Sequence, residues 1–170
     1  MPRIPLITTK EGLDAATAAV FDWVVASRGS MLRPFEVLLH APRLAQPVAE
    51  LGHVVRYEST LDGADRELVI LATGKAHGCA FVWDSHLAPA RTAGVREEAI
   101  SVLDGGDGTL TARERTLVEF ATTLVESSAV DDELFASTAG LIGREGVIEL
   151  ATTIGYYTML GYAMSVADAC

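Results

Sequence analysis

The sequence is poor in cysteine and in aromatic side chains. Its 170 residues include only two cysteines, Cys79 and Cys170, whose spacing is typical of neither a disulfide framework nor a zinc site. Aromatic residues make up 6% of the chain, whereas apolar residues, mainly Ala, Leu and Val, make up 49%. This composition indicates a globular chain and favours helices over a β-sandwich.

Basic residues are also few. The chain carries 13 Lys and Arg against 23 Asp and Glu, which gives a formal net charge of −10. An acidic chain repels the phosphate backbone of nucleic acids, and no cluster of Lys or Arg offsets that repulsion. We therefore expect no nucleic-acid partner.

No segment has the pattern of a targeting signal. Residues 1–16 lack the charged and then apolar order of a secretory signal peptide. Residues 150–167 carry no formal charge and approach the length of a membrane span, but they include several Thr, Tyr and Gly. A helix in the core or at a subunit interface is the better interpretation. We therefore expect a cytoplasmic protein without a membrane segment.

Apolar residues recur at helical spacing along almost the whole chain, and no stretch alternates with period two. Gly29 marks a helix end, Asp62 is a candidate N-cap, and Thr111 with Glu114 forms a capping-box pattern. The sequence predicts one all-α domain over residues 1–170. Helices are expected at 14–27, 35–40, from 42 to about 60, 63–77, 79–93, within 93–103, at 111–127, in a shorter segment after Asp131 or Asp132, and at 144–167.

A faint internal repeat is also present. The segments RELVILAT (Arg66–Thr73) and EGVIELAT (Glu145–Thr152) share their Val/Ile and Ala-Thr pattern. The match predicts a repeated helical hairpin in which Glu67 and His86 occur in the first copy only.

The stretch GCAFVWDSH, Gly78 to His86, concentrates chemically active side chains. On a helix, Cys79, Val82, Trp83 and His86 share one face. Cys79 and His86 lie roughly 10 Å apart along the helix axis, which is too far for a ready hydrogen bond. Val82 lies one turn from His86, where a second cysteine would complete a Cys-x-x-Cys motif, and it has no proton to donate.

Each of these residues has a structural and a functional interpretation. Cys79 is either a small buried apolar residue or a thiol activated by a helix N-terminus. His86 is either a core histidine or an acid–base group. Glu67, one helix earlier, either stabilises the helix dipole or approaches His86 through antiparallel packing, and such a pair moves protons near neutral pH.

Patterns for bound ions or cofactors are missing. No two histidines have the His-x-x-x-His spacing, and no glycine-rich phosphate-binding loop occurs. The turn cluster DGGDGT (Asp104–Thr109) lacks the regular oxygen ligands of a calcium loop. The sequence therefore predicts neither a metal site nor a cofactor.

Glu67, Cys79, Val82 and His86 have the register of the alkylhydroperoxidase D (AhpD) motif E-x11-C-x-x-C-x-x-x-H, with valine at the second cysteine. The wider chain resembles the carboxymuconolactone decarboxylase family. The resemblance is carried by the segments RGSMLRPFEVLLHAPRLA, RELVIL, WDSHLAPARTAGVREEAI, LTARERTLVEFATTLV and IELATTIGYYTMLGY. It implies an AhpD-like helical fold, assembly into homo-oligomeric trimers or hexamers, and pockets near subunit contacts.

The resemblance also implies a reaction class. Peroxidase members use both cysteines of the motif, and Val82 in place of the second cysteine argues against that dithiol mechanism here. Decarboxylase members lack the cysteine pair and use the histidine as proton donor. Our leading hypothesis is a cofactor-free decarboxylase, isomerase or dehydratase acting on a small lactone, carbonyl or carboxylate compound. His86 would transfer the proton, and Glu67 would orient or reprotonate the imidazole of His86. A pocket wall would come from Trp83 with Tyr156 or Tyr157.

Two alternatives remain open at this point. One is a one-cysteine hydroperoxide reductase that uses Cys79 as the attacking thiolate and an external thiol to regenerate it. The other is a non-catalytic helical oligomer that binds a small ligand. Separate packing of Glu67 and His86 would favour the second alternative.

Overall fold

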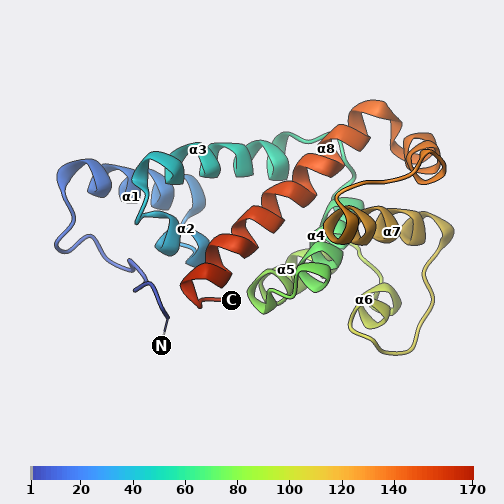
Figure 1. Cartoon of the computed structure of the whole chain (residues 1–170), viewed down its shortest axis with the longest axis horizontal. Coiled ribbons are helices and arrows are strands. Elements are labelled where there is room, and N and C mark those ends of the chain that lie inside the picture. The colour runs from blue at the N-terminus through green and yellow to red at the C-terminus, as the bar shows by residue number, and fades with distance from the viewer. Residues whose placement is uncertain (1) are drawn as a thin grey trace. The chain divides into compact units, whose positions relative to one another are not determined.

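The computed structural model describes residues 2–170, and this part of the chain is helical without a strand (Figure 1). The predicted all-α class is therefore confirmed. The elements are α1 (Ala15–Arg28), α2 (Arg33–Leu38), α3 (Pro42–His53), the π-helix η1 (Val54–Glu58), α4 (Gly63–His77), α5 (Ala80–Ala93), α6 (Glu97–Leu103), α7 (Ala112–Ser127) and α8 (Asp132–Ala167).

Two compact units share these helices. One comprises residues 2–58 and 162–170, and the other comprises residues 59–161. The single domain expected over residues 1–170, of which Met1 lies outside the described residues, stays a prediction. So does the repeated hairpin.

Capping residues fix the helix ends where the sequence predicted them. The Asp14 carboxylate accepts hydrogen bonds from the backbone N–H groups of Ala16 and Thr17 at 2.9 and 3.0 Å, which begins α1. Asp62 likewise accepts from Ala64 at 2.9 Å and begins α4. At α7, Thr111 and Glu114 form the reciprocal capping box.

Two local features differ from the expectation. The helix that starts at Pro42 becomes a π-helix from Val54 to Glu58. Helix α2 begins at Arg33, because a proline fits the first turn of a helix and Pro34 need not precede it. By contrast, the last two expected helices are present as the two parts of α8, which a kink at Gly143 separates, with φ of 74° and ψ of 169°.

In the unit of residues 2–58 and 162–170, a small core joins α1, α2 and α3. Val24, Phe35 and Ala49 are buried there with at most 2% exposure. The Arg28 guanidinium lies over the Phe35 ring, 5.0 Å from its centroid, and donates to the backbone carbonyl of Ala49. Arg28 of α1 thus contacts both α2 and α3.

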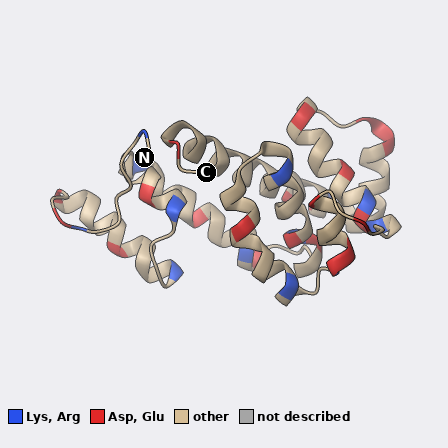
Figure 2. Ribbon diagram, turned by 90° about the horizontal axis from the view of Figure 1, so that it is seen from below, with Lys and Arg blue, Asp and Glu red and all other residues tan. Residues whose placement is uncertain are grey.

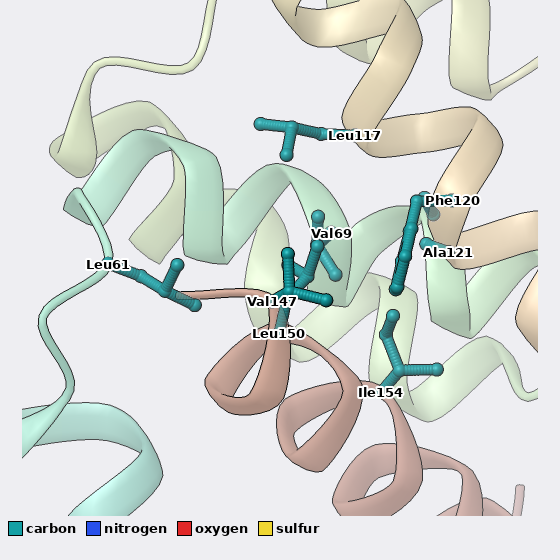
Figure 3. Close-up of a cluster of buried hydrophobic side chains, with 9 residues drawn as sticks. Leu61, Val69, Leu117, Phe120, Ala121, Val147, Leu150 and Ile154 are labelled. Atoms are coloured by element: carbon teal, nitrogen blue, oxygen red, sulfur yellow. The ribbon is translucent and has the colours of Figure 1, made fainter. Parts of the chain in front are cut away.

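In the unit of residues 59–161, α4 is the central helix. Its residues 67–74 are all buried, and it packs against α5 and α7. Figure 3 shows the larger core cluster, in which side chains from α4, α7 and α8 meet. The cluster consists of Leu61, Val69, Ala72, Leu117, Phe120, Ala121, Val147, Leu150 and Ile154.

Glycine permits a close contact between α4 and α5. A Cβ added to Gly74 of α4 would lie 3.0 Å from Val82 Cγ1 and 3.2 Å from the backbone nitrogen of Trp83. A methyl group there would therefore push α5 away from α4. The separation of these two helices matters because the candidate site lies between them.

Charged residues are mixed in sign along the helices. Figure 2 shows Lys and Arg scattered among the more numerous Asp and Glu, without a continuous basic stretch. Across residues 2–170, none of the helices combines the length and the apolar character that crossing a bilayer requires.

Candidate active site

Glu67 of α4 and His86 of α5 form a buried pair. Glu67 Oε2 lies 2.7 Å from His86 Nδ1, and the two residues are 4% and 6% exposed. The approach of Glu67 to His86 that the sequence suggested is therefore confirmed. A carboxylate hydrogen-bonded to one nitrogen of an imidazole fixes which nitrogen is left for chemistry.

The local chain path explains the pairing. Only Gly78 and Cys79 separate α4 from α5, and Gly78 adopts the left-handed conformation with φ of 77°, which ends α4. The chain then reverses, and α5 lies alongside α4 (Figure 1). Residues on the facing sides of the two helices, Glu67 and His86 among them, consequently meet.

A third helix brings aromatic side chains to the pair. The ring of Tyr157, on α8, meets the His86 ring edge to face, with centroids 4.8 Å apart and planes at 87°. Tyr156 meets Tyr157 in the same manner, at 5.2 Å and 88°. Both tyrosines are at most 5% exposed. The structure thus brings Tyr157 to His86 directly and Tyr156 to Tyr157.

Trp83 lies in different surroundings. It belongs to a second core cluster with Leu68 and Leu71, and the Lys75 ammonium lies 4.1 Å from the centroid of its ring. Lys75 also forms a 2.5 Å ion pair with Asp104. These side chains border a hollow of about 470 Å³ that is lined by Gly74, Lys75, Gly78, Cys79, Ala80, Trp83, Asp84 and Asp104.

Cys79 and Val82 both face inward. Cys79 is the N-cap residue of α5 and is 1% exposed, and Val82 is 3% exposed and packs against Gly74. Cys79 therefore borders the hollow beside Trp83, whereas the Glu67–His86 pair lies two turns further along α5.

The local sequence gave no sign of a second buried carboxylate, Asp65, two residues before Glu67. Asp65 is 7% exposed and accepts two-pronged hydrogen bonds from Arg113 of α7, the shortest of 2.6 Å. The Asp65 hydrogen bond raises the pKa of Arg113. Because these residues are 48 positions apart, neither motif nor spacing could have joined them.

No group of three or more His, Cys, Asp or Glu side chains that could hold a metal ion occurs between residues 2 and 170. The Arg113–Asp65 pair instead holds together helices around the site. Arg113 also donates to the backbone carbonyl of Leu141 at 3.3 Å, and so connects α7 with both α4 and α8.

Comparison with known proteins finds a family similarity over part of the chain and a shared fold. The model of the carboxymuconolactone decarboxylase family matches residues 42–104. No curated protein matches the sequence.

Two solved structures share the arrangement of helices. One is a protein of unknown function, ATU0492, from Agrobacterium tumefaciens, for which the role of the antioxidant defence protein AhpD has been suggested. It is 22% identical, with a TM-score of 0.67 over 78% of this chain and 93% of its own. The other is the debrominase Bmp8 without ligand, 19% identical, with a TM-score of 0.73 over 92% of this chain and 86% of its own.

At these identities the structural likeness concerns the fold. The matched segment, residues 42–104, contains the residues that have the register of the AhpD motif, Glu67, Cys79, Val82 and His86. The chain therefore resembles the carboxymuconolactone decarboxylase family over this segment and has an AhpD-like helical fold.

Proposed function

We propose that this protein is a cofactor-free proton-transfer enzyme of the carboxymuconolactone decarboxylase type. Its substrate would be a small lactone, carbonyl or carboxylate compound. The observation that carries the proposal is the buried Glu67–His86 pair with its 2.7 Å contact. A carboxylate and an imidazole, joined and shielded from water, form a general acid–base unit.

The pair divides the work between its members. Glu67 engages Nδ1 of His86, so Nε2 is the nitrogen that exchanges a proton with the substrate. When Nε2 takes up a proton, the imidazole becomes a cation, and the neighbouring carboxylate stabilises it. Little water screens the two charges at 4% and 6% exposure, so this stabilisation is stronger than it would be at the surface.

Two related reactions are open to this unit. In an isomerisation, Nε2 removes a proton from the carbon next to a carbonyl, the electron pair forms an enolate, and the imidazolium returns the proton to another carbon. In a decarboxylation, the carbon–carboxylate bond breaks and CO₂ leaves. The electron pair then stays on carbon as an enolate, which Nε2–H protonates, and solvent restores the proton.

Aromatic side chains would complete the pocket. Tyr157 is buried against His86 and Tyr156 is buried against Tyr157, and a wall of rings would exclude water from a reacting enolate. Trp83 would contribute from the neighbouring hollow on α5. A homo-oligomer, trimer or hexamer, belongs to the same proposal.

The test is turnover by His86→Gln. A panel of small lactones and keto acids is screened with the wild-type protein, and the variant is assayed on any compound that turns over. Loss of the imidazole should reduce kcat by about 10²-fold or more. His53→Gln serves as a matched control because the His53 side chain is 51% exposed on α3. Unchanged turnover by a folded His86→Gln protein would exclude the proposal.

The position of Cys79 favours a second candidate, a one-cysteine hydroperoxide reductase. Cys79 stands at the N-terminus of α5, and a helix N-terminus favours the thiolate form of cysteine. Against this, Cys79 is disulfide-bonded in the structure and only 1% exposed, so the bond would have to be reduced and the sulfur uncovered before it could attack a hydroperoxide.

Trapping distinguishes this candidate from the first. The protein is reduced and desalted, a small hydroperoxide and a sulfenic-acid reagent are added, and each cysteine is followed by mass spectrometry. We expect Cys79 to be labelled no faster than Cys170, which is exposed. Labelling of Cys79 at least about tenfold faster would favour the peroxidase instead.

The non-catalytic alternative has less support. Separate packing of Glu67 and His86 would have favoured it, but the two side chains are in direct contact. A module that only binds a ligand has no need of a buried acid–base pair, and burying one without function costs stability.

A further inference from the structure

We propose that Tyr157 is a positioning residue for His86. Its ring holds the imidazole in the orientation that keeps Nδ1 on Glu67 and leaves Nε2 for the reacting atom. The catalytic meaning of this inference rests on the proposed function, whereas the positioning itself is a property of the folded protein and is measurable without a substrate.

The hydrogen bond to Glu67 selects the nitrogen that is left for chemistry only while the imidazole keeps its orientation, and by itself it does not prevent the ring from turning. The torsion that turns a histidine ring has a broad, roughly two-fold profile, so a half-turn is a nearby alternative. After such a turn a carbon of the His86 ring would face Glu67, and the ring nitrogens would exchange places with carbons. A second contact from another direction is needed to keep one orientation.

Tyr157 supplies that contact. Its ring stands at 87° to the imidazole plane with the centroids 4.8 Å apart, within the range of favourable edge-to-face pairs. Glu67, His86 and Tyr157 come from α4, α5 and α8 respectively, so the imidazole is held from two other helices.

Tyr157 is held rigidly enough to serve as a reference. It is 5% exposed and meets Tyr156 at 5.2 Å. One turn before it, Ile154 belongs to the main core cluster. Earlier on α8, the Glu149 carboxylate accepts hydrogen bonds from Ser59 and Thr60. A side chain on a well-packed helix positions a catalytic group better than one on a loop.

The inference assigns the role to the ring and not to the hydroxyl group. Tyr157→Phe keeps the ring and its edge-to-face contact, so it should preserve the orientation of His86. Tyr157→Leu removes the ring while it remains apolar, so it should release the imidazole. Phe is thus the matched control for Leu. Tyr157→Met, an unbranched apolar residue, replaces Leu if that variant does not fold.

The first readout is the nitrogen NMR spectrum of the histidine side chains in ¹⁵N-labelled protein, with the His86 signals assigned by their loss in His86→Gln. Wild type and Tyr157→Phe should both show a single set of His86 ring signals. In Tyr157→Leu, the NMR signals of the two ring nitrogens of His86 should shift toward each other, or a second set of signals should appear. Identical His86 signals in the Leu and wild-type proteins would overturn the inference.

The second readout is kinetic, on a substrate found in the screen. Tyr157→Leu should reduce kcat about tenfold or more with KM changed less than about threefold, because misorientation slows chemistry more than binding. Because Tyr157→Phe keeps the ring, its kcat should exceed that of Tyr157→Leu by about tenfold. An equal kcat loss in Phe and Leu would assign the role to the hydroxyl and overturn the inference.

The two proposals fail in different ways. If His86→Gln keeps full turnover while Tyr157→Leu alters the His86 signals, the proposed function is wrong and the positioning contact is real. If His86→Gln is inactive while Tyr157→Leu leaves signals and kcat unchanged, the proposed function stands and Tyr157 is not a positioning residue.

Discussion

At the scale of single residues, the substitution Glu67→Gln separates the effect of the negative charge on His86 from the effect of the hydrogen bond. Glu67→Gln keeps an oxygen that can accept from His86 Nδ1 but removes the negative charge that stabilises an imidazolium. Changing a group that orients a catalytic side chain commonly costs 10-fold to 100-fold in activity, so we expect kcat to fall by about that amount. The measurement is steady-state turnover, with Glu97→Gln, an exposed acid on α6, as the control. Equal activity of the two variants would contradict the role of the charge.

Glu114 gives a prediction of pH dependence. The hydrogen bond from Arg96 is the largest of the influences that lower the Glu114 pKa from 4.5 to about 2. Because the folded-state pKa lies below the ordinary value, this carboxylate stabilises the fold above about pH 4.5. The stabilisation is lost as pH falls from there through about 2.

Replacement of Glu114 tests the direction in which stability changes with pH. At pH 7, Glu114→Gln should lower the free energy of unfolding by about 1–2 kcal/mol, since the Arg96 side chain is partly exposed and solvent screens the pair. The deficit relative to wild type should shrink at pH 3. Urea unfolding at both pH values measures it, and a deficit that grows toward low pH would refute the assignment.

The sequence predicted part of the candidate site. Glu67 and His86 were identified because they match a motif and lie on helices joined by a two-residue turn, Gly78 and Cys79. Tyr156 or Tyr157 was expected in the pocket wall, but the direct contact of Tyr157 with His86 was not predictable, because it depends on how α8 packs against α5. Trp83 was expected beside the tyrosines, but its described contacts are with Lys75 and the second core cluster.

At the scale of the helices, Gly143 is the sharpest local constraint. It interrupts α8 with φ of 74° and ψ of 169°, a backbone region that is nearly restricted to glycine. Gly143→Ala should therefore reduce the free energy of unfolding by about 1–3 kcal/mol. Chemical denaturation followed by circular dichroism provides the value.

Gly140 is the matched control in the same helix. A Cβ added there meets no atom within 4 Å, and the residue is helical and exposed. Gly140→Ala should therefore be neutral or stabilising by up to about 1 kcal/mol, because alanine is the better helix former. Equal effects of the two substitutions would show that the backbone at Gly143 is not strained.

Helix boundaries were predictable wherever a cap marked them. Asp62 and Gly78 bracket α4, and Thr111 begins α7, as the side-chain chemistry requires. The kink at Gly143 likewise separates the two helices that the sequence predicted, whereas the π-helix at Val54–Glu58 has no comparable local signal.

At the scale of the whole molecule, the net charge of −10 bears on the proposed assembly. Acidic copies repel one another at low salt, and the Debye length falls to about 10 Å at 0.1 M ionic strength. We therefore expect trimers or hexamers that associate more tightly as salt rises. Light scattering after size-exclusion chromatography, at low and moderate salt, measures the mass. A mass of 18.0 kDa, that of one chain, under both conditions would contradict the assembly.

The division into two compact units has an optical consequence. The chain holds two tryptophans, and each unit contains one of them, Trp23 in the unit with the N-terminus and Trp83 in the other. Trp23→Phe and Trp83→Phe therefore leave a single intrinsic fluorophore in a known unit. The Lys75 ammonium lies 4.1 Å from the centroid of the Trp83 ring and affects its fluorescence, so the emission wavelength of Trp83 reports on the hollow near α5. Coincident melting of the two signals would identify one cooperative domain, and separated melting would resolve two.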